Sequence, residues 1–252
     1  MKTITTALSV LPWSDWLALV LFFAGWAGYA IWAKKRARLR PSVLALTNRE
    51  RMRWMLQASH RENRVLDGVV VQNLSTSPSF FASTTILIIG GLLAVLSRTE
   101  QASELVREIP FAARTSLIVF DMKLVLLAGI FVYAFFRFTW SLRQYTFGAL
   151  LVAAAPDSNA WISESQRSAF ASRAGRVMGL AAETFNDGLR SYYMAFAATA
   201  WFFSPWAFMA GTATVIYIMY RREFHSDVLA VLGEDLGAAD AAAVTSSARA
   251  EG

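Results

Sequence analysis

The sequence predicts an all-α protein built around helices that cross a membrane. Four apolar runs of at least 17 residues cover 16–33, 80–96, 115–136 and 192–220, and a helix needs about 20 residues to cross a bilayer core. The runs are continuous rather than alternating, which disfavours barrel strands. Because backbone groups in hydrocarbon must pair within the protein, we expect a polytopic helical membrane protein with about four transmembrane helices and two cytoplasmic amphipathic helices.

The charge distribution supports this fold class. The formal net charge is +6, and residues 34–64 hold ten Lys or Arg against two acids, directly after the first apolar run. Cytoplasmic loops carry such a basic excess. The charge therefore indicates membrane topology rather than nucleic acid binding, and the expected partners are the lipid bilayer and further copies of the chain in a homo-oligomer.

Several classes of chemistry find no support in the residues. The chain has no cysteine, which removes thiolate catalysis, iron–sulfur clusters and zinc–thiolate sites. There is no Walker loop, dinucleotide fingerprint or Gly-x-Ser-x-Gly motif, and the two histidines, His60 and His225, form no metal-binding pattern. We expect no cofactor, no metal, no catalytic residue and no enzymatic activity.

The N-terminus lacks the features of a signal peptide, because residues 1–12 hold one lysine and no short apolar core with a cleavage site. The first apolar run should therefore stay in the protein as a helix, which Ser14 or Asp15 can cap.

Residues 43–74 are predicted to form one helix along or below the membrane, broken at 75–79 by a Ser/Thr/Pro segment. Its apolar stripe holds Met52, Met55, Leu56, Leu66, Val70 and Leu74. Residues 97–114 balance three arginines with three glutamates, so this connector should lie outside and can hold a short amphipathic helix.

A second amphipathic helix is predicted over 164–190. Apolar residues recur there at offsets of three and four, namely Phe170, Ala174, Val177, Met178, Ala181, Phe185 and Leu189. Packing beneath the spans explains this stripe better than a dedicated lipid-binding surface. Residues 144–155 are apolar enough that an extra half-span there stays open.

The last apolar run has two interpretations. Ser204 and Pro205 interrupt it, and one kinked helix is simpler than a hairpin, because two crossings need about 40 residues. Four crossings then put Arg221 and Arg222 outside, against the usual bias, whereas a turn at Pro205 would return them inside. We expect a helical membrane domain over 1–232 and a disordered tail over 233–252.

Several segments together resemble the bacterial and plant membrane-protein family called domain of unknown function 599. They are residues 61–67, 80–88, 121–124 and 138–145, with residues 11–16 and 220–224 similar to the family's edges. The resemblance spans roughly residues 10–225. It implies a multi-span helical membrane protein, and it carries no assigned reaction, substrate or catalytic residue. The location that we expect for this protein is the bacterial inner membrane.

Two charged residues inside the third apolar run are the first candidates for function, since ionisable groups in a membrane are costly. Asp121 and Lys123 are two positions apart, so they point to different faces of a helix and each needs another partner. A structural pairing, such as Asp121 with Arg114, is the simpler interpretation, and a pathway or ligand role is the alternative.

A second set of candidates should lie near the cytoplasmic ends of the spans. Arg64 and Asp67 can pair locally, and arginines at span ends can hold lipid phosphate or a carboxylate. The candidate residues of this polar cluster are Asn63, Arg64, Asp67, Arg137, Arg143, Gln144, Asn186 and Arg190.

These features leave three classes of function open. The leading hypothesis is a non-enzymatic, oligomeric membrane protein that contributes to transport. The alternative is a membrane scaffold or lipid-interacting protein without transport, and the third is a membrane-embedded enzyme. The residues identify no solute, lipid or subunit number.

Overall fold

The described part of the chain is a bundle of α-helices without strands, as the sequence predicts. The computed structural model describes residues 11–37, 42–108 and 116–234. Its elements are α2 (Trp13–Arg36), α3 (Val43–His60), α4 (Val65–Leu96), α5 (Thr99–Glu108), α6 (Leu117–Ala153), α7 (Glu164–Thr199), the short 3₁₀ helix η1 (Ala200–Phe202) and α8 (Pro205–Phe224).

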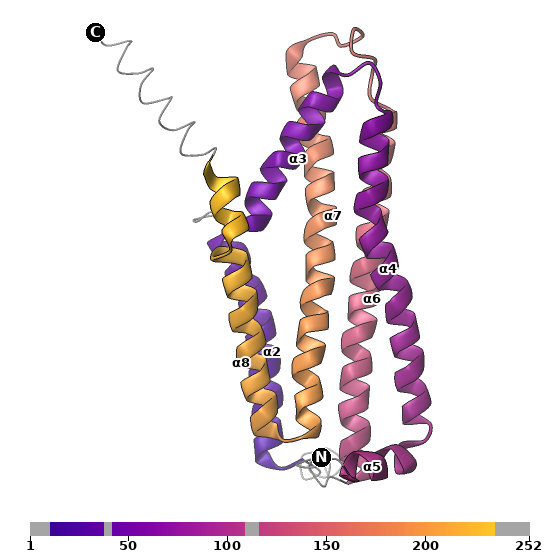
Figure 1. Ribbon diagram of the computed structural model, residues 1–252, viewed down its shortest axis with the longest axis vertical. Coiled ribbons are helices and arrows are strands. Elements are labelled where there is room, and N and C mark those ends of the chain that lie inside the picture. Colours follow the sequence, from indigo (N-terminus) through magenta and orange to yellow (C-terminus); the bar gives the residue numbers. More distant parts are fainter. Residues whose placement is uncertain (1–10, 38–41, 109–115, 235–252) are drawn as a thin grey trace, which may run out of the picture.

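The bundle has a thick lower part and a thinner upper part (Figure 1). Helices α4, α6 and α7 run through both parts, with α6 packed on α4 and on α7. Helices α2 and α8 lie side by side along the lower part only, whereas α3 packs on the upper half of α7. Helix α5 lies across the lower end. In the described part of the chain, α2 and α8 thus accompany the lower portions of α4, α6 and α7, whereas α3 accompanies their upper portions.

Among the described residues, three helices, α2, α4 and α6, are long and apolar enough to cross a membrane. They contain the first three apolar runs. The fourth run is divided between the end of α7, η1 and α8, so the interpretation as a single kinked helix is wrong. Figure 1 shows α7 descending and α8 rising beside it.

A local cap explains the hairpin. Ser204 has an extended backbone, as the residue before a proline prefers, and its hydroxyl accepts a hydrogen bond from the Ala207 amide at 3.0 Å. Pro205 occupies the first turn of α8, where its missing N–H costs nothing. The run becomes a hairpin because α7 supplies a long first arm that begins far upstream, at Glu164.

The predicted helix over 43–74 is also wrong, because the chain reverses between α3 and α4. Arg61 leaves the helical conformation, and the Asn63 side chain accepts a hydrogen bond from the Val65 amide at 2.9 Å as α4 begins. The break predicted at 75–79 is absent, since Pro78 lies buried inside the continuous helix α4. Two residues of the predicted stripe, Met52 and Leu66, are exposed, while Met55 is fully buried.

The apolar stripe predicted on residues 164–190 is buried, with Phe170, Ala174, Met178 and Ala181 in the core. A neighbouring stripe of small residues lets α3 approach α7 closely. A Cβ atom added to Gly175 would lie 2.8 Å from the Cα atom of Met52, and one added to Gly179 would lie 3.1 Å from the Asn48 side chain. The contact of α3 with α7 therefore depends on glycine.

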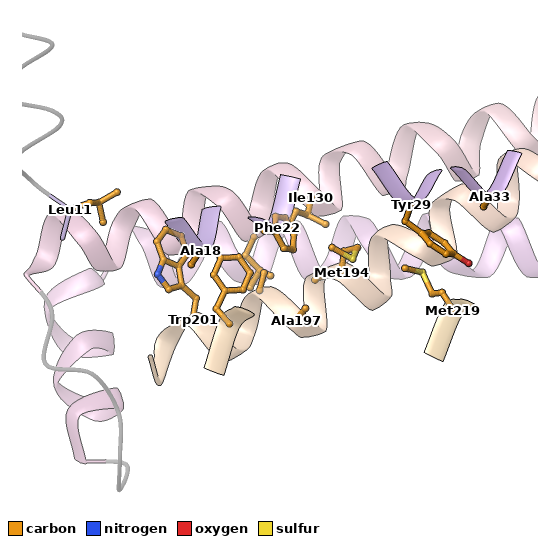
Figure 2. Packing of buried hydrophobic residues seen from close by; sticks show 14 of the residues in the cluster. Leu11, Ala18, Phe22, Tyr29, Ala33, Ile130, Met194, Ala197, Trp201 and Met219 are labelled. Atoms are coloured by element: carbon orange, nitrogen blue, oxygen red, sulfur yellow. The ribbon is translucent and has the colours of Figure 1, made fainter. Parts of the chain in front are cut away.

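The core of the lower part is aromatic and tightly packed (Figure 2). Phe22 from α2, Phe208 from α8 and Trp201 from η1 are at most 1% exposed, and the rings of Phe208 and Trp201 stack at 5.4 Å. Met194 of α7 and Ile130 of α6 close the same core. The described residues of the predicted tail, Gly233 and Glu234, are helical, as are residues 227–232 before them, and the rest of the tail lies outside the described residues.

Replacing Gly175 by alanine tests the close contact of α3 and α7. The new methyl group meets backbone that cannot rotate away, so we expect the free energy of unfolding to fall by about 1–2 kcal/mol. Gly68→Ala is the matched control, because no atom lies within 4 Å of its added Cβ and alanine is the better helix former by about 1 kcal/mol. Thermal unfolding of both variants in detergent measures the difference. Equal midpoints would argue against the contact.

Candidate functional site

The residues predicted as one polar cluster fall into separate places along the bundle. Asp121 and Lys123 lie near the lower end of α6. Arg137, Asn186 and Arg190 lie where α2 and α8 end, and they are close in space. Asn63, Arg64 and Asp67 lie at the upper tip, whereas Arg143 and Gln144 lie on α6 between these two levels. The sequence thus identified polar residues but not their grouping.

At the lower end, Lys123 closes an internal contact. Its side chain is 2% exposed, and its Nζ atom donates a hydrogen bond to the Trp201 carbonyl at 2.8 Å. The ammonium group also lies 5.4 Å from the centre of the Trp201 ring, a cation–π arrangement. Trp201 in turn donates its Nε1–H to Asp15 at 2.6 Å.

Asp15 is a member of this contact that sequence reasoning missed. The sequence suggests a helix cap at this position, but α2 starts after Pro12 and receives no side-chain cap. Asp15 is 5% exposed. The sequence signal that could have identified its contact with a distant residue is its position between two tryptophans at the start of an apolar run.

Asp121 is partly exposed, and its Oδ1 atom has no hydrogen-bond partner among the described residues. Arg114, its expected partner, lies outside them.

Four charged residues form what we call the junction cluster: Arg137, Asp187, Arg190 and Glu223. Arg137 of α6 pairs with Asp187 of α7. Arg190 lies 3.3 Å from Asp187 and 3.9 Å from Glu223 of α8. Glu223 also accepts a hydrogen bond from the Leu44 amide at the start of α3, at 3.4 Å. The cluster therefore links α3, α6, α7 and α8 at one level.

Two further polar contacts lie at the same level. Lys34, at the upper end of α2, pairs with Glu183 of α7 at 2.9 Å. Arg222 of α8 donates a hydrogen bond to the Tyr193 hydroxyl of α7 at 2.7 Å. Helices α2 and α8 both end at this level, and each is attached to α7 by a charged side chain near its C-terminal end.

The two polar levels enclose an apolar belt. Lys123 and Arg137 are 14 positions apart on α6, which corresponds to about 21 Å along the helix axis, and the sequence between them holds no charged residue. Aromatic pairs stand at both edges: Trp13 with Trp206 below and Trp32 with Tyr220 above. Tryptophan and tyrosine at both edges of an apolar zone are typical of membrane–water interfaces.

A cavity of about 200 Å³ lies beside the junction cluster. Its polar lining consists of Tyr29, Thr47, Asn186, Arg190, Tyr193, Arg222 and Glu223. Tyr29 is 7% exposed, and its hydroxyl has no hydrogen-bond partner within the described part of the chain. Figure 2 shows the Tyr29 ring and its hydroxyl oxygen beside Met219 of α8.

The ion pair predicted between Arg64 and Asp67 is wrong, because each side chain has other partners at the upper tip. Asp67 is fully buried, and it pairs with Arg61 at 2.5 Å and accepts a hydrogen bond from Trp54 at 2.7 Å. Arg64, expected to pair with Asp67, instead donates to the carbonyls of Ala155 and Pro156 in the α6–α7 connection. These contacts hold the reversal between α3 and α4 against that connection.

The remaining predicted residues have local surroundings. Arg143 is exposed, with its guanidinium 5.9 Å from the centre of the Phe147 ring. Gln144 is buried, and its Oε1 atom has no partner among the described residues. In the same part of the chain, no group of three or more His, Asp or Glu side chains is arranged to hold a metal ion.

The fold and its two polar levels define a class: an all-helical protein of long helices, three of them able to span a membrane. A family model described as "Protein of unknown function, DUF599" matches residues 17–228. The chain therefore belongs to this family, as its sequence segments suggested. No curated protein and no solved structure matches it.

Replacing Asp187 tests the junction cluster. Asp187→Asn leaves two guanidinium groups without their shared carboxylate, so we expect the free energy of unfolding to fall by about 2–3 kcal/mol. Asp157→Asn is the control, because Asp157 is exposed. Adding Arg137→Gln to Asp187→Asn should cost much less than Arg137→Gln alone, as a double-mutant cycle in detergent would show. Additive losses would contradict the pairing.

Proposed function

We propose that this protein is a non-enzymatic, polytopic membrane protein that acts as a scaffold and interacts with lipids, rather than as a conduit for solutes. It crosses the membrane five times, with the lower part of the bundle in the bilayer and the upper part in the cytoplasm as a helical head. Helices α2, α4 and α6 have the length and composition for crossing. Helix α8 and the lower part of α7 pack in the same apolar core.

The charge distribution supports this orientation. The α7–α8 hairpin brings Arg221 and Arg222 to the level at which Lys34, Lys35 and Arg36 end α2. All five basic residues then lie on one side, which agrees with the positive-inside bias. Five crossings thus remove the conflict that four crossings create for the C-terminal arginines.

The internal position of Lys123 is the observation that favours a scaffold over a conduit. A pathway residue should face a wet cavity, whereas the Lys123 ammonium group is buried against the Trp201 carbonyl and ring. Between the two polar levels the described core consists of closely packed residues such as Phe22, Phe208 and Met194. Transport remains the second candidate because the buried Oδ1 atom of Asp121 has no partner among the described residues.

Cysteine labelling tests the topology directly, because the chain has no cysteine of its own. Gln101→Cys on α5 and Gln57→Cys on α3 both introduce an exposed thiol. In intact cells a membrane-impermeant maleimide should label the first and reach the second only after permeabilisation. Asp227→Cys, just beyond α8, should behave as Gln57→Cys does. Labelling of Asp227→Cys in intact cells would contradict five crossings.

A flux assay distinguishes the scaffold from the transport component. Purified protein in liposomes should pass small cations and anions no faster than protein-free liposomes, and Lys123→Met should behave like the unmodified protein. The reason is that both charged groups buried at the lower level, Lys123 and Asp15, make their hydrogen bonds to protein groups rather than to solvent. Flux that Asp121→Asn changes would favour transport instead.

A further inference from the structure

We infer that the cavity beside the junction cluster binds the phosphate of an anionic lipid headgroup, and that the groove between α2 and α8 receives one of the lipid's acyl chains. The inference rests on the proposed function, because it needs the junction level to lie at the cytoplasmic surface of the membrane. It deepens that proposal by assigning a ligand class and the side chains that contact it.

The Tyr29 hydroxyl is the first observation. It lies on a side chain that is 7% exposed, it lines the cavity, and it has no partner in the described residues. Buried polar groups are nearly always hydrogen-bonded, since an unpaired one carries the cost of its lost hydration. Among the described residues the hydroxyl is therefore a donor without an acceptor, and the cavity that Tyr29 lines is where an acceptor can lie.

The charges around the cavity select an anion. Arg190 and Arg222 line it and outnumber the single carboxylate, Glu223. Each guanidinium has five N–H donors, and the contacts of Arg222 include one hydrogen bond to Tyr193, so donors remain for phosphate oxygens. The first residues of α3, Val43 and Leu44, also line the cavity, and the N-terminal end of a helix attracts negative charge. Asn186 adds an amide.

Glu223 faces the protein's own positive groups rather than a free cation. Its carboxylate lies 3.9 Å from Arg190 and accepts the Leu44 amide at 3.4 Å. Both contacts are long, so Glu223 weakens the positive field at the cavity without cancelling it. The carboxylate therefore limits the affinity for an anion, and its removal should raise that affinity.

The size and place of the cavity favour a lipid over free phosphate. About 200 Å³ admits a phosphate with a small substituent but no acyl chain. Tyr29 lines a second, apolar space as well, a groove of about 660 Å³ between α2 and α8. The small residues Ala24, Gly25 and Gly28 hollow this groove, and Trp32, Tyr217 and Tyr220 border it. The headgroup of a lipid in the cavity and one acyl chain of the same lipid in the groove would thus both lie beside Tyr29.

Lipid binding by the purified full-length chain tests the inference. Its thermal midpoint and bound-lipid count by native mass spectrometry would be measured in nanodiscs of phosphatidylcholine, with and without phosphatidylglycerol, and in detergent with inorganic phosphate. We expect phosphatidylglycerol to raise the midpoint, because a ligand that binds only the folded state stabilises it. Wild-type protein without such a shift or retained lipid would overturn the inference, and the labelling and flux results would stand independently.

Tyr29→Phe is the decisive variant. It should weaken phosphatidylglycerol binding roughly tenfold, as expected for losing a hydrogen bond to a charged group, while the midpoint without lipid stays equal or rises. Tyr133→Phe is the matched control on a half-exposed tyrosine of α6. A lower midpoint without lipid, combined with unchanged lipid binding, would mean that the hydroxyl has only a structural role and would overturn the inference.

Three further variants and one control separate the effect of charge from that of shape. Arg222→Gln should weaken lipid binding and Glu223→Gln should strengthen it, whereas Arg173→Gln on an exposed part of α7 should change nothing. Gly28 lines the groove, and no atom lies within 4 Å of a Cβ added there, so Gly28→Leu should occupy the groove. It should abolish the effect of the lipid and spare any effect of inorganic phosphate. Equal responses to lipid and phosphate that survive Gly28→Leu would overturn the lipid assignment.

Discussion

The shared carboxylate of Asp187 is the contact on which the arrangement of the upper and lower parts depends. It pairs with Arg137 of α6 and lies 3.3 Å from Arg190 on its own helix. Arg190 extends the link to Glu223 of α8, and Glu223 reaches the start of α3. Four helices are thus held at one level by one connected set of charges. Because all four residues are only partly exposed, the set has few alternative partners and specifies a single arrangement.

That level has a counterpart about 21 Å below it on α6, where Lys123, Trp201 and Asp15 form the second polar contact. The belt between them has no charge on α6 and a core of large aromatic and small alanine side chains. Charged groups at the two edges of an uncharged belt suit a protein whose middle lies in hydrocarbon, because each charge then has either a protein partner or access to an interface. The cavity at the upper level is consistent with this layering, since it offers donors where headgroups would lie.

The sequence predicted many of the residues of the candidate site, but it did not predict which of them pair with one another. Arg137 and Arg190 were identified by their places at the ends of apolar runs, with Asn186 as a further member of the cluster, and the three lie close together. Asp187 and Glu223, their acidic partners, carry no distinguishing pattern in the sequence, because a carboxylate in an amphipathic segment usually faces water. At the tip, Arg64 and Asp67 have suitable spacing for a local pair, yet Asp67 binds Arg61 and Trp54 instead. Local spacing cannot anticipate a chain reversal that brings another arginine closer.

The sequence by itself determined the all-α class, the apolar helices and the family, because run length, hydropathy and segment similarity are local properties of the chain. Only the tertiary structure decided the α7–α8 hairpin, the continuation of α4 through Pro78 and the break between α3 and α4. Each of these depends on which surfaces pack together. A proline can lie inside a continuous helix or mark its end, and the residues that pack around it decide between the two. The Tyr29 hydroxyl, which has no hydrogen-bond partner among the described residues, is likewise a property of the assembled helices, because only their packing decides which polar groups lie near it.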